Sequence, residues 1–144
     1  MGAAVTARKE FRVATLAEPI SHYTDAVQAG GLVFVSGMVP VDREGALVGG
    51  DDVVAQAHQV FANVGAALAE AGCGFGDVVK VTVYVTDIDD RPRINPVRQH
   101  VFGAARPAST LIEVSRLAVP GAKLEVEAVA LVPAAAPQRS EKRD

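Results

Sequence analysis

Two carboxylates, those of Glu125 and Glu127, are spaced to do acid–base chemistry. They alternate with apolar residues in the segment KLEVEAVALV, residues 123–132, which is the period of a β-strand. Both therefore lie on one face of that strand, about 7 Å apart. Carboxylates this close repel each other, which raises the pKa of one and suits it to general acid or base catalysis inside a pocket. Two simpler interpretations stay open: the face is simply wet, or one glutamate pairs with an arginine such as Arg116.

The other reactive side chains form no established catalytic or metal-binding pattern. Tyr23 and Ser36 lie beside expected turns or strand ends, and each taken singly is interpreted as structural. His22, His58 and His100 are scattered, with no cysteine or acidic partner at ligand spacing, so no metal site is predicted.

No cofactor is expected either. The glycines of AGCGFG, residues 71–76, follow a helical pattern and not a strand, so they do not form a phosphate-binding loop. Gly72 is interpreted as the end of that helix, and Cys73 beside it as a small buried filler.

The composition bounds the class of protein. The chain has 144 residues, 49% hydrophobic and 22% charged, which allows one domain with one core. A net charge of -3 and a pI near 5.6 provide no basic surface for a phosphate backbone, so nucleic acid is not an expected partner. The single cysteine and the lack of a long apolar run indicate a cytoplasmic protein without a membrane partner. A core rich in Ala and Val favours further burial through oligomerisation.

Hydrophobic periodicity predicts an α+β fold, with one mixed β-sheet and two helices packed on one face. Residues 1–132 are expected to form a single domain, and 133–144, which lack periodicity, a disordered tail. The expected elements are a strand at 9–15, a hairpin over 25–42, a helix from 51 to 72, a strand at 77–88, a short helix after 95, and strands at 107–117 and 122–132.

Two local assignments depend on single residues. Pro96 in the middle of a helix would cost about 3 kcal/mol, so Asn95 is predicted to cap the second helix with Pro96 at its first position. In the strand at 77–88, strict alternation predicts that four valines share the buried face and that the other face is polar and rich in Thr and Tyr. The four are Val79, Val81, Val83 and Val85. The polar face is typical of a surface that meets another subunit.

Three separated motifs, occurring in order, resemble the RidA (YjgF) family over residues 17–132. They are SHYTDAVQAGGLVFVSGMVPVD, then VVKVTVYVTDIDD followed by Asn95, then PAST with LEVEAVA. The resemblance implies a chorismate-mutase-like fold assembled as a homotrimer, whose sheets form an inner barrel with a cleft at each subunit interface. That assembly fits the polar strand face and the core of small side chains.

The resemblance also implies a chemistry. Well-studied members hydrolyse reactive enamines and imines, such as 2-aminoacrylate, to 2-keto acids and ammonia. In them an arginine of a Pro-Ala-Arg-Ser motif holds the substrate carboxylate, and a glutamate on the last strand orients or activates water. Carried over residue by residue, this makes Glu125 the catalytic candidate. The substrate-binding candidates are Tyr23, Ser36, Asn95, Ser109 and Thr110.

Ser109 stands where those members have the arginine. A serine offers one neutral hydrogen bond worth about 1 kcal/mol, whereas arginine offers a charged fork. Affinity for a carboxylated imine is therefore expected to fall, and Ser109→Arg is expected to create or raise 2-aminoacrylate activity. Arg106 lies three residues upstream, on the opposite face of an extended chain, which argues against it as a substitute.

Two functions follow as hypotheses. The first is a hydrolytic deaminase of enamines, imines or related small molecules in the inter-subunit cleft, which the retention of Glu125 and Tyr23 favours. The second is a non-catalytic trimer that binds a metabolite or a partner protein, which the missing arginine favours. Some relatives are described as endoribonucleases or translation inhibitors, but the acidic pI and the lack of a basic, aromatic stripe argue against RNA here.

Overall fold

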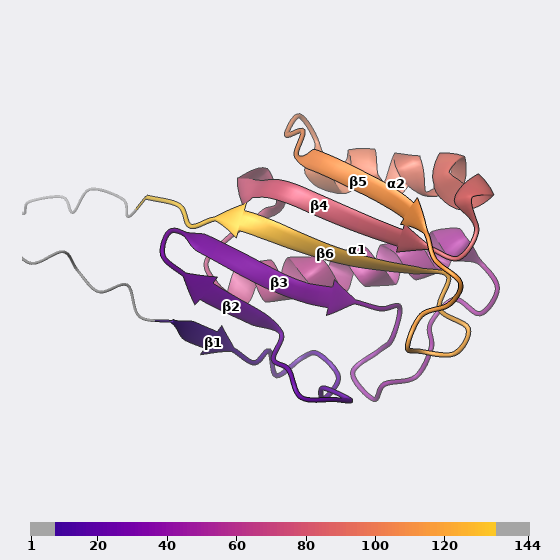
Figure 1. Cartoon of the computed structure of the whole chain (residues 1–144), viewed down its shortest axis with the longest axis horizontal. Coiled ribbons are helices and arrows are strands. Elements are labelled where there is room, and N and C mark those ends of the chain that lie inside the picture. The colour runs from indigo at the N-terminus through magenta and orange to yellow at the C-terminus, as the bar shows by residue number, and fades with distance from the viewer. Residues whose placement is uncertain (1–7, 135–144) are drawn as a thin grey trace, which may run out of the picture.

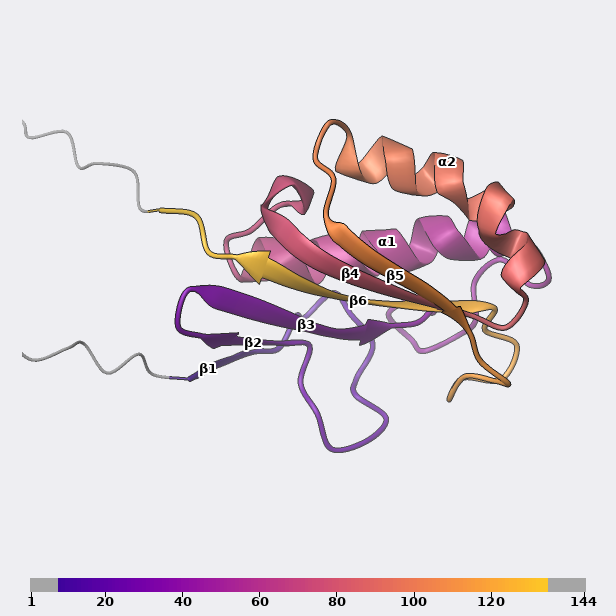
Figure 2. The same ribbon diagram turned by 45° about the horizontal axis from the view of Figure 1, so that its top comes forward.

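The computed structural model describes residues 8–134 and shows one mixed β-sheet with both helices on the same face (Figures 1 and 2). The sheet order is β1-β2-β3-β6-β4-β5, and every neighbouring pair is antiparallel except β4 and β5, which are parallel. The predicted α+β fold is confirmed. The predicted tail lies mostly outside the described residues. The strands are β1 Lys9–Phe11, β2 Ala26–Ala29, β3 Leu32–Met38, β4 Val78–Val85, β5 Ala108–Glu113 and β6 Leu124–Leu131, and the helices are α1 Val53–Glu70 and α2 Arg91–Phe102, with 3₁₀ turns η1 Phe75–Asp77 and η2 Ile88–Asp90.

The long helix α1 forms where its periodicity predicts. The Asp52 side chain caps it by accepting hydrogen bonds from the amides of Val54 and Ala55, and Gly72, with φ of 78°, follows its end. Its apolar side, which includes the fully buried Phe61, packs against β3 and β6. This packing fixes the centre of the sheet from behind.

The first strand is shorter than the prediction. β1 ends at Phe11, and shortly after it the backbone amide of Val13 donates to the buried carboxylate of Asp25 at 2.7 Å instead of to a strand. The Gly30–Gly31 hairpin between β2 and β3 forms as predicted, with Ala29 opposite Leu32.

The predicted face of four valines on β4 is wrong at its first position. Val79 is 45% exposed, while Val78 is buried beside Val81. The cause is a register shift between Val78 and Lys80 where β4 pairs with β6, the mark of a β-bulge that reverses the alternation. The other three valines are fully buried, as expected.

The predicted start of the second helix is also wrong. α2 begins at Arg91, with Pro92 in its first turn, so Asn95 is not a cap and Pro96 lies inside the helix. A proline in the first turn removes no intrahelical bond, which makes Pro92 the natural start. The bond lost at Pro96 is offset by burial of Ile94 and Val97 on either side of it.

The sheet face turned away from the helices, called here the open face, carries both polar and apolar groups. Lys80 and Thr82 lie on it, and so do Phe34 and Leu131, which are 45% and 53% exposed. Among the residues that the structure describes, no helix has the length and apolar character needed to cross a membrane.

Candidate functional site

Glu125 lines a cavity of about 340 Å³ at one end of the open face, here called the Glu125 cavity. Its wall includes two other residues that the sequence singled out, Tyr23 and Ser36, which come from a loop before β2 and from β3. Apolar side chains complete it, among them Ile20 and Val119. The structure thus brings three of the six predicted site residues together, although their roles remain predictions.

A glycine on β3 lets the Glu125 carboxylate sit close to the backbone. β3 and β6 pair regularly as far as Val35, and the register shifts between Val35 and Met38. Gly37 lies inside this shift, and a Cβ added there would stand 2.9 Å from the Glu125 Cδ and closer still to its Oε1. Any larger residue at position 37 would therefore push the carboxylate out of place.

The two glutamates of β6 share a face, as their spacing predicts, but their environments differ. The Tyr84 hydroxyl donates a 2.7 Å hydrogen bond to Glu127, and that bond raises the pKa of Tyr84 and keeps it a donor. Glu125 accepts no hydrogen bond from residues 8–134. Burial raises the pKa of Glu125, and the negative charge of Glu127 adds to the effect. Glu125 is thus the carboxylate left available to a ligand or a water.

The loop that carries Tyr23 is tied to the sheet by a partly buried ion pair. The Asp25 carboxylate is 4% exposed and receives a 2.7 Å hydrogen bond from the Arg12 guanidinium. The Ser36 hydroxyl donates to the carbonyl of Thr24 at 2.6 Å, and its amide to the carbonyl of Asp25. These bonds hold the loop over β3, so Tyr23, 48% exposed, stands at the mouth of the Glu125 cavity.

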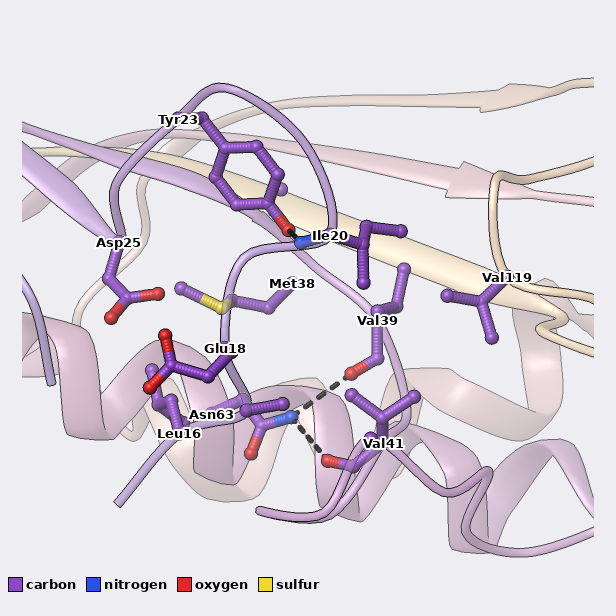
Figure 3. Close-up of a pocket in the computed structure, with 13 residues that line it drawn as sticks. Leu16, Glu18, Ile20, Tyr23, Asp25, Met38, Val39, Val41, Asn63 and Val119 are labelled. Carbon is purple, nitrogen blue, oxygen red and sulfur yellow. Dashed lines mark hydrogen bonds between the residues drawn. The ribbon is translucent and has the colours of Figure 1, made fainter. Parts of the chain in front are cut away.

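A smaller recess of about 80 Å³ adjoins the Glu125 cavity beneath Tyr23 (Figure 3). The two share several lining residues, including Gly37 and Val39. Asn63 of α1 closes its floor, because its amide donates to the carbonyls of Val39 and Val41 at 3.0 Å each. The recess is mostly apolar and could receive a small aliphatic group.

Ser109 and Thr110 point to opposite faces of β5. Thr110 lies on the open face, where its hydroxyl accepts a 2.6 Å hydrogen bond from Lys80 Nζ. Ser109 faces α2, and its hydroxyl accepts a 2.7 Å hydrogen bond from Nη2 of Arg98. Neither residue lines the Glu125 cavity.

Asn95 lies on the side of α2 that leads to Ser109. It is exposed and stands three residues before Arg98, so the two share one flank of the helix. A further cavity of about 410 Å³ lies between Arg91 and Leu111 on the same side. We call this surface, made of Arg91, Asn95, Arg98, Ser109 and Leu111, the Ser109 edge.

One chain cannot bring the two places together. β4 lies between β5 and β6 in the sheet, which separates those strands by about 10 Å. Ser109 also faces the helices, whereas Glu125 lies on the open face opposite Tyr84. A small molecule bound at Glu125 therefore does not reach Ser109 of the same chain.

Sequence reasoning missed Gly37 and Arg98. A glycine within an apolar strand pattern is a known sign of a bulge or a close approach, so Gly37 could have been found. The contact of Arg98 with Ser109 joins α2 to β5 through tertiary packing, so no spacing in the sequence could have indicated it. Within residues 8–134 no three acidic, histidine or cysteine side chains are placed to hold a metal. Cys73 is buried, which raises the pKa of its thiol.

Comparisons with known proteins agree on one family. The family model described as endoribonuclease L-PSP matches residues 14–132. A RutC family protein of Pyrococcus abyssi is 40% identical over 113 residues, covering 78% of this chain and 88% of the relative. A 2-iminobutanoate/2-iminopropanoate deaminase of Salmonella typhimurium is 39% identical over 115 residues, with shares of 78% and 88%. The crystal structure of Escherichia coli TdcF with bound serine superimposes with a TM-score of 0.79 at 34% identity, covering 85% of this chain and 98% of TdcF.

Proposed function

This chain belongs to the endoribonuclease L-PSP family, the Rid or RutC proteins, and on that premise we propose that it is a hydrolytic deaminase of imines and enamines. The observation that carries the proposal is the Glu125 carboxylate: half-buried, with a raised pKa, without a hydrogen-bond partner among the described residues, and held in a cavity with Tyr23 and Ser36. The similarity to the 2-iminobutanoate/2-iminopropanoate deaminase of Salmonella typhimurium supports it.

The geometry suits a carboxylate that transfers protons. Glu125 takes a proton from a water molecule as the water oxygen bonds to the carbon of a protonated C=N group. The resulting carbinolamine then loses its nitrogen as the carbon–oxygen double bond forms. Glu125 gives its proton to the departing nitrogen, and the hydroxyl proton of the carbinolamine passes to the released ammonia. The products are therefore a carbonyl compound and ammonium, and water is the only co-reactant. Because the pKa of Glu125 is raised, it lies closer to neutral pH, and the group can both accept a proton from water and hold it until the nitrogen takes it.

The cavities favour a small substrate. The recess of about 80 Å³ beneath Tyr23 adjoins Glu125 and offers mostly apolar walls to a short side chain. The net charge of -3 and the acidic pI favour a metabolite over RNA, despite the description of the family model. No cofactor enters the proposal, and a cytoplasmic location is proposed with it.

We further propose that the working site lies between two subunits of a homotrimer. The predicted site residues fall on two separate surfaces of one chain, the Glu125 cavity and the Ser109 edge. A neighbouring copy could bring its Ser109 edge to the Glu125 cavity of the first. The exposed apolar groups of the open face, Phe34, Ile112 and Leu131, would be covered in such an assembly.

The direct test measures ammonia and 2-keto acid release from 2-aminoacrylate and 2-iminobutyrate generated in situ. Wild type is expected to exceed the spontaneous rate, and Glu125→Gln to lower kcat by about 100-fold or more, since general acid–base catalysis supplies that much. Glu70→Gln, which removes an exposed carboxylate at the end of α1, is the matched control. Equal rates for Glu125→Gln and wild type would remove Glu125 from the mechanism.

Ser109 supports a second candidate, a non-catalytic member that binds a metabolite or a partner protein. Position 109 offers a neutral hydroxyl where the RidA-family members with a Pro-Ala-Arg-Ser motif carry an arginine. The same assay separates the two functions. No release above the spontaneous rate, from a folded wild type and with any of several imines, would favour the binding function.

A further inference from the structure

Arg98 is a half-buried cation with no carboxylate partner in the described part of the chain. Its only side-chain partner there is the neutral hydroxyl of Ser109, at 2.7 Å. By contrast, Arg8, Arg12 and Arg93 each pair with a carboxylate. Burial lowers the pKa of Arg98, with no opposing effect from an acid. A cation removed from water without a counter-charge is costly, and an anion placed beside it recovers part of that cost.

The acidic groups on this side of the molecule lie away from Arg98. Glu113 is four residues further along β5 than Ser109, about 13 Å in an extended strand, and accepts a hydrogen bond from the amide of Ile88. Asp89 lines the cavity beside Arg91, at the opposite end of α2. The place between Arg98 and Ser109 thus keeps a net positive charge that a ligand can meet.

We propose that Arg98, presented across Ser109, is the anchor for the carboxylate of the substrate. The inference deepens the proposed function and rests on it. A side chain at position 109 leaves β5 toward α2, and the Arg98 guanidinium reaches the same point from the helix. The small Ser109 leaves room for the guanidinium and accepts one of its five N–H donors, so at least two donors stay available to a carboxylate.

The arrangement names a substrate class. A single fork of donors on a partly exposed edge fits one carboxylate, so among the imines and enamines of the proposed function the anchor selects those with one carboxylate. Asn95, one helical turn before Arg98 on the same flank, can donate its amide to the second carboxylate oxygen. The reacting carbon would then face the Glu125 cavity of a neighbouring copy.

Substitutions at Arg98 test the anchor by its effect on KM. Arg98→Gln is expected to raise KM for 2-imino acids by about 10- to 100-fold with a smaller change in kcat, which is the range for a lost charged hydrogen bond. Arg98→Lys keeps the charge but not the fork and is expected to lie in between. Arg93→Gln removes a cation from the same helix, where it pairs with Asp90, and is the matched control.

A binding measurement separates the anchor from turnover. Titration calorimetry with 2-oxobutyrate, which carries the carboxylate but does not react, is expected to show the same loss of affinity in Arg98→Gln, about 10- to 100-fold. The primary amide 2-oxobutanamide has nearly the same shape without the charge, so all variants are expected to bind it alike.

Moving the arginine back to the strand is a second, independent test. Arg98→Ser alone is expected to lose the anchor, and Arg98→Ser combined with Ser109→Arg to regain most of it. Ser109→Arg alone would put two guanidinium groups side by side, so we no longer expect it to raise activity as the sequence suggested.

The possible outcomes test the Arg98 anchor and the proposed deaminase function separately. Unchanged KM and 2-oxobutyrate affinity in a folded Arg98→Gln would overturn the anchor while leaving deamination intact. Arg98-dependent binding of 2-oxobutyrate by a wild type that releases no ammonia would keep the anchor and remove the deaminase. A wild type that deaminates imines but does not bind 2-oxobutyrate would again overturn the anchor.

Discussion

The Glu125 cavity and the Ser109 edge are opposite in charge and in construction. The cavity holds a carboxylate on a central strand, seated against the backbone at Gly37, and no cationic side chain lines it. The Ser109 edge lies where α2 meets the outermost strand, β5, and it holds the positive charge of Arg98 on α2, which has no carboxylate partner within residues 8–134. The Glu125 cavity fixes a carboxylate in position, and the Ser109 edge presents a half-buried guanidinium at the surface.

This difference shows what each half of a site must supply. Proton transfer needs a carboxylate placed to within a fraction of an ångström, which a packed sheet can provide. Holding an anion needs a cation at a certain place, and either a strand or a helix can deliver it. At the Glu125 cavity, a substrate with a carboxylate meets only negative charge and is repelled. At the Ser109 edge, it meets a cation but no group that can transfer a proton. The two surfaces are complementary only when two copies meet.

Gly37→Ala is expected to have the largest effect, because it changes the position of the Glu125 carboxylate without changing its chemistry. The new methyl group would meet the end of the Glu125 side chain and not the backbone, so the carboxylate moves while the fold survives. We expect kcat to fall by about 100-fold, since a displacement of 1 Å can cost that much. The free energy of unfolding should change by less than about 1 kcal/mol. Both quantities are measured by steady-state assay and chemical denaturation.

Gly31→Ala provides the control for that variant. Gly31 lies in the turn before the same strand, and an added Cβ there meets nothing within 4 Å. A wild-type rate for Gly37→Ala with the carboxylate displaced would show that the exact place of Glu125 does not matter, and the contrast between the two surfaces would lose its meaning.

Mixing subunits tests whether the two surfaces work as halves of one site. If each site takes Glu125 from one copy and Arg98 from the next, random trimers of Glu125→Gln and Arg98→Gln chains contain about a quarter of intact sites. At 2-imino acid concentrations well below KM, where each variant alone keeps at most about a tenth of the wild-type rate, we therefore expect co-refolded mixtures to regain about a quarter of that rate.

The outcome against a shared site is equally clear. A mixture that stays at the average of its two parents would show that both groups act within one chain or that one of them does not act at all. Mixing Glu125→Gln with wild type is the control for exchange itself, since about half of the wild-type rate is then expected.

The two regions also differ in how far the sequence alone predicts them. The shared face of Glu125 and Glu127 follows from the two-residue period of a strand, and the cavity with Tyr23 and Ser36 agrees with the resemblance. The fold class follows from the same periodicities. These features depend on regular geometry that every strand or helix repeats, so a sequence pattern carries them.

The features that the sequence did not predict are local departures from regular strand and helix geometry. A bulge reversed the alternation at Val79, and burial of Ile94 and Val97 kept a helix running through Pro96. Arg98 contacts Ser109 because α2 packs beside β5, and no spacing rule predicts that contact. Tertiary packing decides such exceptions, and the contact of Arg98 with Ser109, on which the proposed anchor rests, is one of them.

Glu127→Gln sharpens the account of the Glu125 cavity and has the smallest expected effect. Burial first, and the charge of Glu127 second, raise the pKa of Glu125, so removing that charge lowers the pKa only in part. The amide carbonyl introduced by this substitution can still accept the Tyr84 hydrogen bond that Glu127 receives. Glu125 must be ionised to take a proton from water, so kcat/KM falls as pH falls through its pKa. The acid limb of the profile is therefore expected to move to lower pH, by less than about one unit.

The raised pKa of Glu125 should also make the free energy of unfolding depend on pH. A carboxyl with a raised pKa in the folded state favours folding below its unfolded pKa, and this contribution is lost as pH rises through the folded value. Because Glu127→Gln brings the pKa of Glu125 down, the variant should lose less stability than wild type between acidic and neutral pH, as thermal unfolding at several pH values will show. Glu70→Gln, remote and exposed, should leave the acid limb in place. If Glu127→Gln also leaves it in place, the limb belongs to another group, and Glu125 is not the base whose environment the cavity was built to tune.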